Sequence, residues 1–540
     1  MRKRAVAVLG TAAVLSGMVT AVPSAAGTAA PAAAPRPAAE RAPVKWTDCS
    51  TDDYPTLQCA TVKSPLDHDR PGGRQITLAL SRVPHTAKKS QGPLLVNPGG
   101  PGGSGRSLAG FVARSLPKDV ASQYDVIGFD PRGVGASKPA LDCKPGYFDP
   151  VRPDSLPAGG GAERANLARV KDFAESCGKK HGSLLRYMDS ASAAEDMDVI
   201  RQQLGAERIN YLGYSYGTYL GAVYAKLHPE RVRRAVFDSV VDPSGVWYEN
   251  NLGQNVAFES RQQAFTAWIA KHDATYGLGG NPAEVEAKWT RMRQALARKP
   301  AGGKVGAAEL EDTFLPGGYY NGYWPDLAKA FAAYANDGKT APLVDAYQKF
   351  GAVDAAGDNG YSVYTAVQCR DAGWPRDWNQ WRHDMWRSHA KAPFITWNNA
   401  WYNAPCAFWP TRSLQPTDVT NAKLPPVLLF QATEDAATPY EGAVSLHHRL
   451  RGSSLVVEEG GANHGVTLAG NKCLDRHLAD YLDTGKVPRS AGVADAICDP
   501  LPEPEPAKAT RAASANGPEK APASRGSQAA SLHDLLGHDS

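Results

Sequence analysis

Short apolar runs alternate with helix-like segments between residues 45 and 240. The apolar runs predict strands over 75–83, 93–97, 124–129 and 234–240, with another at 209–212. Ser192 and Glu195 have the spacing of a capping box, which predicts a helix that ends at Gly205. Alternation of this kind is typical of a mostly parallel sheet with helices on both faces, so the predicted fold class is α/β.

The pattern changes after the strand at 234–240. Residues 243–423 are rich in Trp, Tyr and helix-like segments, and strand-like runs resume at 427–431 and 454–458. A gap of this length is too long for a structureless loop in a compact protein, so it predicts an inserted, mainly helical cap domain. The expected organisation is a first part of the core at 45–242, the cap at 243–423 and a second part of the core at 424–500.

Both ends of the chain have the composition of segments outside the fold. Arg2, Lys3 and Arg4 precede an apolar stretch, and small residues follow, so residues 1–26 are predicted to be a secretory signal peptide. Residues 27–44 are Ala- and Pro-rich, as in a flexible leader or pro-segment, and residues 501–540 have the composition of a disordered tail. We therefore expect a secreted protein without a membrane anchor.

The charge and the cysteines narrow the class of protein. The net charge of +4 is small for 540 residues and the basic residues are scattered, which gives no support to nucleic-acid binding. The eight cysteines in a chain with an export signal predict disulfides, and no spacing typical of a metal site is present, so neither metal nor cofactor is expected. Pairing of sequence neighbours is one of 105 possible connectivities. It would join Cys49 to Cys59, Cys143 to Cys177, Cys369 to Cys406 and Cys473 to Cys498.

The segment Gly213-Tyr214-Ser215-Tyr216-Gly217 has the G-x-S-x-G pattern directly after an apolar run and directly before a helical one. This is the context of a nucleophile elbow, in which a tight strand-to-helix turn exposes the serine hydroxyl. The pattern alone also fits an ordinary Gly/Ser turn. A nucleophilic serine needs a base and an orienting carboxylate, so the hypothesis depends on finding both.

Two loops that follow predicted strands supply these groups. Asp435 follows the strand at 427–431 and precedes a predicted helix start, with Thr438 as N-cap and Pro439 as the first helical residue. Glu434 is its rival for the orienting carboxylate. His464 lies in a Gly-rich loop after the strand at 454–458. Active sites of parallel sheets lie at the carboxyl ends of the strands, and the order Ser, Asp, His is that of α/β-hydrolases.

A Gly-rich loop at 97–105 follows the strand at 93–97, where α/β-hydrolases place one donor of the oxyanion hole. The second donor would be the backbone N–H of Tyr216, the residue after the nucleophile. A phosphate-binding loop is the competing interpretation, but the segment has no G-K-[ST].

Taken together, several motifs resemble those of the prolyl-aminopeptidase family of α/β-hydrolases, especially its exported actinobacterial tripeptidyl aminopeptidases. The resemblance covers about residues 45–500. It rests on Asn97-Pro98-Gly99-Gly100-Pro101-Gly102, Asp130-Pro131-Arg132-Gly133, the elbow, Asp435 with Thr438-Pro439, and His464-Gly465. It implies Ser215 as nucleophile, Asp435 as orienting carboxylate, His464 as base, and Gly100 and Tyr216 as oxyanion donors. Asn97 stands where many relatives have His.

The resulting hypothesis is a secreted serine exopeptidase that releases short peptides, tripeptides by the resemblance, from free N-termini. A substrate ammonium group needs a carboxylate partner, for which Asp371, Glu249 and Asp242 are candidates. The alternatives are an exported carboxylesterase or amide hydrolase with the same triad, and a non-catalytic binding protein on a hydrolase scaffold. The expected partners are peptide substrates, and nothing in the sequence specifies an oligomeric state.

Overall fold

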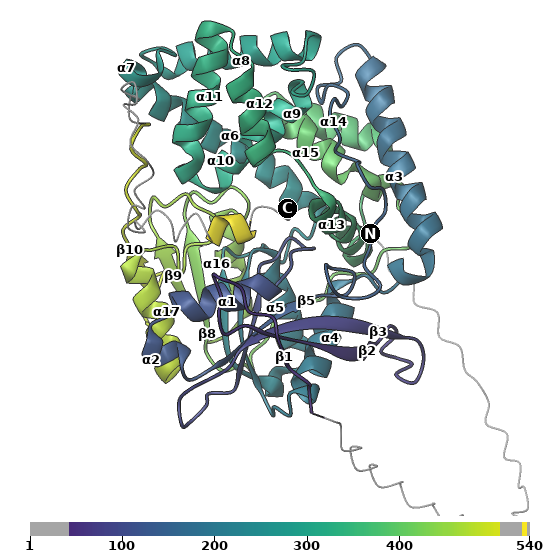
Figure 1. The fold of residues 1–540 in the computed structure, drawn as a ribbon, viewed down its shortest axis with the longest axis vertical. Coiled ribbons are helices and arrows are strands. Elements are labelled where there is room, and N and C mark those ends of the chain that lie inside the picture. The colour runs from purple at the N-terminus through teal and green to yellow at the C-terminus, as the bar shows by residue number, and fades with distance from the viewer. Residues whose placement is uncertain (1–42, 508–531, 537–540) are drawn as a thin grey trace, which may run out of the picture. The chain divides into compact units, whose positions relative to one another are not determined.

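A computed structural model describes residues 43–507 and 532–536 of the chain (Figure 1). The predicted signal peptide and all but the last two residues of the predicted leader lie outside the described residues.

One sheet of ten strands forms the centre of the described structure. Its spatial order is β1 (Thr47–Asp48), β2 (Gln58–Pro65), β3 (Gln75–Val83), β5 (Asp125–Asp130), β4 (Pro93–Asn97), β6 (Ile209–Tyr214), β7 (Val232–Asp238), β8 (Val427–Ala432), β9 (Ser454–Glu458) and β10 (Ala496–Cys498). The first three strands and the β3–β5 pair are antiparallel, and all pairs from β5 to β10 are parallel. The predicted, mostly parallel sheet is therefore present, and it places the carboxyl ends of β4, β6, β7, β8 and β9 at one edge.

Alternate residues of the central strands enter separate cores on the two faces of this sheet. Leu95 and Tyr211 belong to one core, and Val96 and Leu212 to the other. Helices α4 (Ser190–Gln203), α5 (Tyr216–Leu227) and α16 (Tyr440–Arg449) cover the first face. Helices α1 (Arg106–Ser115), α2 (Lys118–Ala121) and α17 (Lys472–Thr484) cover the second. Because the central strands are buried on both faces, they appear in the sequence as continuous apolar runs.

The cap lies between β7 and β8 and has a core of its own. It consists of α6 (Tyr248–Lys271), α7 (Asp273–Tyr276), α8 (Pro282–Arg298), α9 (Ala307–Phe314), α10 (Pro316–Tyr319), α11 (Trp324–Asp337), α12 (Ala341–Phe350), α13 (Ala355–Asp371), α14 (Trp378–His389) and α15 (Thr396–Asn403). Three short 3₁₀ turns are also present, η1 (Pro229–Arg231) before β7, and η2 (Asn321–Tyr323) and η3 (Ala404–Phe408) in the cap.

A second helical insertion, between β5 and β6, packs against the cap. Its main element is α3 (Gly161–Leu185), which stands beside α14 in Figure 1. Glu163 of α3 accepts hydrogen bonds from Trp378 and Arg382 of α14. The described cap surface is therefore built from two separate insertions, of which the sequence indicated one.

The Asp-Pro-Arg-Gly motif after β5 has a structural role. Arg132 is buried and pairs with Asp196 of α4 through two hydrogen bonds of 2.8 and 2.7 Å. Coulombic attraction and hydrogen bonding to Arg132 keep the pKa of Asp196 below its usual value despite the opposing effect of burial. Asp130 accepts a hydrogen bond of 2.6 Å from Ser104, which ties the Gly-rich loop after β4 to the end of β5.

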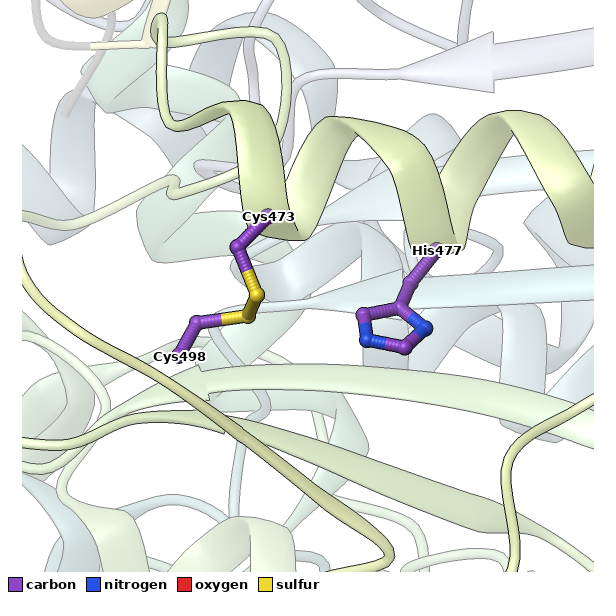
Figure 2. A group of neighbouring side chains, drawn as sticks. All are labelled: Cys473, His477 and Cys498. Carbon is purple, nitrogen blue, oxygen red and sulfur yellow. A yellow bond between two sulfur atoms is a disulfide. The ribbon is translucent and has the colours of Figure 1, made fainter.

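The eight cysteines form four disulfides between sequence neighbours, the arrangement that the sequence suggested. One of them, Cys473–Cys498, joins α17 to β10, and His477 lies beside it (Figure 2). A cysteine binds a metal ion as a free thiolate, and the two sulfur atoms here are bonded to each other. The group is therefore a cross-link at the sheet edge rather than a set of metal ligands.

Two local expectations differ from the structure. The predicted capping box at Ser192 is wrong, because α4 begins earlier and Asp189 is its N-cap, accepting a hydrogen bond of 2.7 Å from Ser192 N. Residues 532–536, within the segment expected to be disordered, form a helical turn. No helix among the described residues has the length and hydrophobicity needed to span a membrane.

Candidate active site

Ser215 lies in the sharp turn between β6 and α5. Its backbone has φ 55° and ψ −127°, a conformation that non-glycine residues rarely adopt. A Cβ at Gly213 would lie 2.5 Å from the carbonyl oxygen of Gly217, and a Cβ at Gly217 would lie 2.9 Å from Asn97. The close passage of helix and strand therefore requires both glycines of the motif, and it leaves the Ser215 side chain facing a pocket.

The Gly-rich loop after β4 lies directly against this turn. A Cβ at Gly99 would lie 2.6 Å from Tyr214 O and 2.9 Å from Ser215 Cβ, and Gly99 has φ +102°. The Gly99 N–H donates to the Asn97 side chain at 3.0 Å, and the next residue, Gly100, lines the pocket. Tyr216 lines the same pocket, and its N–H is at the N-terminus of α5, where the helix dipole favours negative charge. The two expected oxyanion donors are thus on the same cavity as Ser215.

His464 and Asp435 form a buried hydrogen-bonded pair. The His464 Nδ1 atom lies 2.9 Å from Asp435 Oδ2 and 3.1 Å from Oδ1, and both side chains are almost fully buried. Because an ionised carboxylate only accepts hydrogen bonds, Nδ1 carries the proton and Nε2 is the acceptor. Glu434 is exposed, and of the two adjacent acids only Asp435 is hydrogen-bonded to the imidazole among the described residues.

The loop after β8 fixes the Asp435 carboxylate from the other side. It accepts hydrogen bonds from the backbone N–H groups of Ala437 and Thr438, at 2.9 and 3.0 Å, and from the Thr438 hydroxyl at 2.9 Å. The prediction of Thr438 as N-cap of the next helix is wrong, because α16 begins at Tyr440 with Pro439 as N-cap. The threonine hydroxyl bonds Asp435 instead.

Ser215 and His464 line the same pocket. Among the described residues no hydrogen bond joins the serine hydroxyl to the imidazole in this conformation. Contacts of this kind are commonly loose in ligand-free enzymes and tighten when substrate binds. The backbone of His464 is held by Tyr319 of the cap, whose carbonyl accepts its N–H at 2.8 Å, and the Tyr319 ring meets the imidazole edge-to-face at 5.5 Å.

The pocket has a volume of about 880 Å³ and lies between the strand ends and the cap. Its lining includes one cationic side chain, Lys349, which pairs with Asp326 on the cap surface. It also includes five carboxylates, from Asp242, Glu249, Asp312, Asp354 and Glu441. Asp312 is ion-paired with Arg152, so the excess of negative charge comes from the other four acids. This excess favours a cationic group on whatever the pocket binds.

The three acids suggested by the sequence occupy different places. Glu249, in the first turn of α6, lines the pocket, is exposed and makes no hydrogen bond or ion pair among the described residues. Asp242 also lines the pocket, and its carboxylate accepts hydrogen bonds from Ser244. Glu441 of α16, which sequence reasoning missed, is a further exposed acid on the wall.

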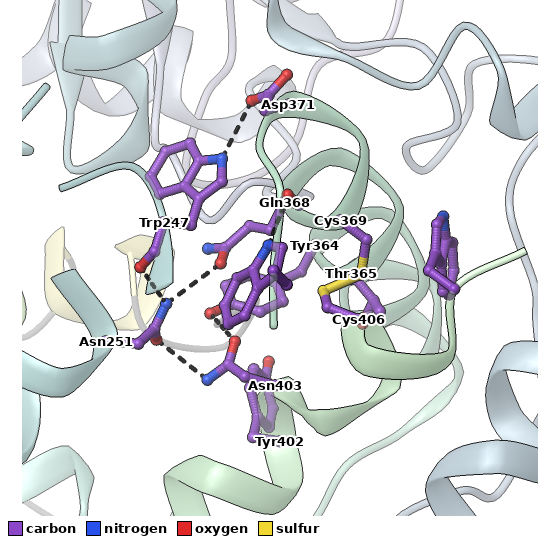
Figure 3. The surroundings of a disulfide bond; sticks show 12 residues. Trp247, Asn251, Tyr364, Thr365, Gln368, Cys369, Asp371, Tyr402, Asn403 and Cys406 are labelled. Atoms are coloured by element: carbon purple, nitrogen blue, oxygen red, sulfur yellow. Dashed lines mark hydrogen bonds between the residues drawn. A yellow bond between two sulfur atoms is a disulfide. The ribbon is translucent and has the colours of Figure 1, made fainter. Parts of the chain in front are cut away.

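Asp371 is not part of the pocket wall. It is buried at the end of α13, where Ser190 N and Oγ donate to it at 2.7 and 2.6 Å. Trp247 Nε1 also donates to it, at 3.3 Å (Figure 3). Burial, together with the charge of Asp189, raises the pKa of Asp371 to about 7. Trp247, which Asp371 bonds directly, and Tyr216, which it bonds through Ser190 Oγ, both line the cavity. Asp371 supports these two rings and does not reach a bound ligand.

The wall beside Asp371 is cross-linked. The Cys369–Cys406 disulfide joins α13 to η3, and an amide network connects this region to α6 (Figure 3). Asn251 of α6 contacts Gln368 at 3.4 Å and accepts from Asn403 at 3.0 Å. The helices behind this part of the pocket wall are consequently joined by a disulfide and by side-chain hydrogen bonds.

Comparisons with known proteins identify the family of the chain. Residues 92–468 match a family model described as alpha/beta hydrolase fold. The chain is 44% identical over 481 residues to a tripeptidyl aminopeptidase of Streptomyces lividans, covering 87% of this chain and 89% of the relative. It is 33% identical over 482 residues to the serine protease Hip1 of Mycobacterium tuberculosis, covering 83% and 90%. It is also 33% identical over 508 residues to a carboxylesterase B of Mycobacterium tuberculosis, covering 89% and 96%.

Proposed function

This chain belongs to the α/β-hydrolase family and is a serine peptidase close to the actinobacterial tripeptidyl aminopeptidases, and from that premise we propose that it is a secreted exopeptidase that releases tripeptides from free N-termini. The observation that carries the proposal is the Asp435–His464 pair on the same acidic pocket as Ser215.

In the proposed reaction Ser215 Oγ attacks the scissile carbonyl carbon while His464 Nε2 takes the hydroxyl proton. The carbonyl oxygen becomes an oxyanion, which the N–H groups of Gly100 and Tyr216 stabilise. His464 then gives its proton to the leaving amine, and an acyl-enzyme on Ser215 remains. Water, deprotonated by the same imidazole, attacks the ester and releases the short peptide. Asp435 stays ionised throughout and stabilises the imidazolium.

Recognition of a free N-terminus requires an anion at a fixed distance from Ser215. Glu249 is our first candidate because its carboxylate is unengaged among the described residues and faces the pocket from the cap. Asp242 is the second, since it lines the same wall. The length of peptide released would then be set by the spacing between this acid and the nucleophile.

The test compares a tripeptidyl p-nitroanilide with its N-acetylated form. A peptidase that anchors the ammonium group cleaves the free form at least about 10-fold more efficiently, because the acetylated substrate leaves the carboxylate unpaired. Equal cleavage of the two would remove the anchoring proposal. Mass spectrometry of digests of longer peptides shows how many residues leave in each event.

The second candidate function is an exported carboxylesterase or amide hydrolase, which is favoured by the similarity to a protein named carboxylesterase B. Ester and amide hydrolysis pass through similar oxyanions, so the same side chains serve both. Strong turnover of p-nitrophenyl esters without cleavage of any free-amine peptide would select this alternative.

Secretion is supported by the four disulfides, which persist in oxidising compartments. We expect the mature protein in the culture medium with an N-terminus after residue 26. N-terminal sequencing of the exported protein tests this, and recovery of an intact Met1 inside the cell would contradict it.

A further inference from the structure

The segment Leu532–Leu536 forms a helical turn against the candidate active site. Leu532, His533 and Leu536 are buried, and Asp534 is exposed. Figure 1 draws the turn as the short yellow helix near α10. A five-residue turn with three buried side chains is docked onto the protein rather than merely adjacent to it.

Its contacts are to the loop that follows α10. The His533 ring stacks on Tyr320, with ring centroids 4.1 Å apart and planes inclined by 17°. The Tyr323 hydroxyl donates to Asp534 Oδ1 at 2.7 Å. The carbonyl of Tyr319, the last residue of α10, accepts the His464 N–H, so the docked turn and the imidazole are held by adjacent residues of one segment.

A second contact is to the residue after the imidazole. Gly465 has φ +83°, and a Cβ there would lie 2.4 Å from Leu536 Cδ1 and 3.7 Å from Leu532 Cδ2. The absence of a side chain at Gly465 therefore leaves room for Leu536 beside the residue that follows His464. A larger residue at 465 would displace the turn.

Two side chains of the turn face the pocket. His533 and Leu536 line it together with Ser215 and His464, and the cavity keeps its 880 Å³ with the turn in place. The turn therefore forms part of the pocket wall and does not fill the pocket. His533 Nε2 is buried and has no hydrogen-bond partner among the described residues. Burial, with a smaller contribution from the charge of His464, lowers the pKa of His533 to about 3, so the ring is neutral at ordinary pH.

The position of the turn identifies the side of the scissile bond that it meets. His464 protonates the leaving amine in the proposed reaction, so the leaving peptide must pass close to this imidazole. The residues packed around the loop at 464–465 consequently border the leaving-group side of Ser215.

We propose that Leu532–Leu536 forms the subsite for the residues that follow the scissile bond, with His533 Nε2 hydrogen-bonded to the leaving peptide's backbone and Leu536 against its first side chain. This inference rests on the proposed peptidase function. Buried polar atoms normally have partners, and a peptide backbone supplies the one that His533 lacks.

The experiment uses two truncated forms of the chain. One ends at Ser531 and lacks the turn, and the matched control ends at Leu536 and lacks only the last four residues. Each is assayed on a tripeptide methyl ester, whose methanol leaving group is too small to reach the turn, and on the same tripeptide extended by two residues with the first one varied. We expect the Ser531 form to lose about 10-fold or more in kcat/KM on the extended peptides, together with selectivity for the first leaving residue. On the ester the Ser531 form should lose clearly less than on the extended peptides, and the control should match the full chain on both substrates.

His533→Ala gives a second test that leaves the turn in place. It should lower kcat/KM on the extended peptides by about 5- to 10-fold more than on the ester, because one hydrogen bond to the leaving side is lost. Equal losses on both substrates, a gain on either, or no change would each overturn the subsite. Failure of the full chain to cleave any extended peptide would instead overturn the proposed peptidase function.

Discussion

The Asp238 carboxylate at the end of β7 accepts the backbone N–H of Thr467 at 2.7 Å. The same carboxylate accepts the Val466 N–H at 3.0 Å, and its neighbour Ser239 accepts the Gly465 N–H at 2.7 Å. Three successive amides after His464 are thus held by the end of one strand. Burial raises the pKa of Asp238, and these hydrogen bonds oppose the rise. The imidazole is positioned by a carboxylate that never touches it.

Replacing this anchor should disturb the imidazole without removing it. Asp238→Asn exchanges an acceptor oxygen for a donor facing backbone N–H groups, so we expect a loss of about 10-fold or more in kcat and ~1–3 kcal/mol of stability. Steady-state kinetics and thermal melts measure both. Asp480→Asn, the same change at an exposed site on α17, is the control and should alter neither. Unchanged kcat in Asp238→Asn would show that the loop does not need this anchor.

Ser215→Ala should abolish turnover while the protein stays folded. We expect kcat/KM to fall by ~10³-fold or more, with little change in melting temperature, because the hydroxyl forms no hydrogen bond among the described residues. Covalent labelling by a fluorophosphonate, detected by intact-protein mass spectrometry, should disappear in the same variant. Persistent labelling would place the nucleophile at a different residue.

Asp435 and Glu434 are adjacent acids, but we expect only the substitution of Asp435 to lower kcat strongly. Asp435→Asn places an amide opposite His464 Nδ1 and favours the wrong tautomer, so kcat should fall by ~10³–10⁴-fold. Glu434→Gln changes an exposed side chain and should leave kcat within about 2-fold. Comparable losses of kcat in both variants would mean that Asp435 is not the carboxylate that orients His464.

The strands of the sheet could be predicted because strands that are buried on both faces consist of apolar runs between turn residues. The runs at 75–83, 93–97 and 454–458 coincide with β3, β4 and β9. Helix starts were less predictable, because several nearby residues can cap the same helix. Asp189 rather than Ser192 caps α4, and the Thr438 hydroxyl bonds Asp435 instead of capping α16. The helix α3 was missed because nothing in its local sequence reveals that it packs against a distant cap.

The candidate site was accessible from the sequence to the extent that its residues follow strand ends. Its supports were not, since Asp238 looks like any strand-terminal acid and becomes an anchor only when the chain returns 228 residues later. The docked turn does leave a signal. Leu532, Leu535 and Leu536 have the i, i+3, i+4 spacing of a helix face, within a tail whose overall composition suggests disorder.

Glu249 offers a direct test of amine recognition. Glu249→Gln keeps the shape and removes the charge, so KM for free-amine tripeptide substrates should rise about 10-fold or more. Cleavage of the N-acetylated substrates should not fall, because they carry no ammonium group. Glu441→Gln, at the other exposed acid of the wall, is the control. Both variants weaken the general negative potential of the pocket alike, so a larger rise in KM for Glu249→Gln identifies Glu249 as the specific partner of the ammonium group.

Stability should fall as pH rises through the range in which the buried acids of the folded state lose their protons. Asp371 has a pKa of about 7 in the folded protein against 3.8 as its ordinary value, and burial raises the pKa of Glu458 to about 7 as well. Between about pH 4 and 7 the folded state therefore holds protons that the unfolded state has released, so unfolding becomes easier as pH increases. The contribution is constant below this window, and above it the cost of burying the ionised carboxylates applies in full.

Asp371→Asn isolates the share of one group in this trend. The amide cannot ionise, so the variant avoids a cost whose upper bound for Asp371 is on the order of 4 kcal/mol at pH 8. At pH 5 less than half of this cost, on the order of 1–2 kcal/mol, is present, while the loss of an acceptor for Ser190 and Trp247 applies in full, so the variant should melt below the native chain there. We expect the difference in melting temperature between the two proteins to shrink or reverse from pH 5 to pH 8 in calorimetry. A difference that stays constant across this range would mean that Asp371 is already ionised in the folded protein at pH 5, and that its hydrogen bonds from Ser190 outweigh its burial.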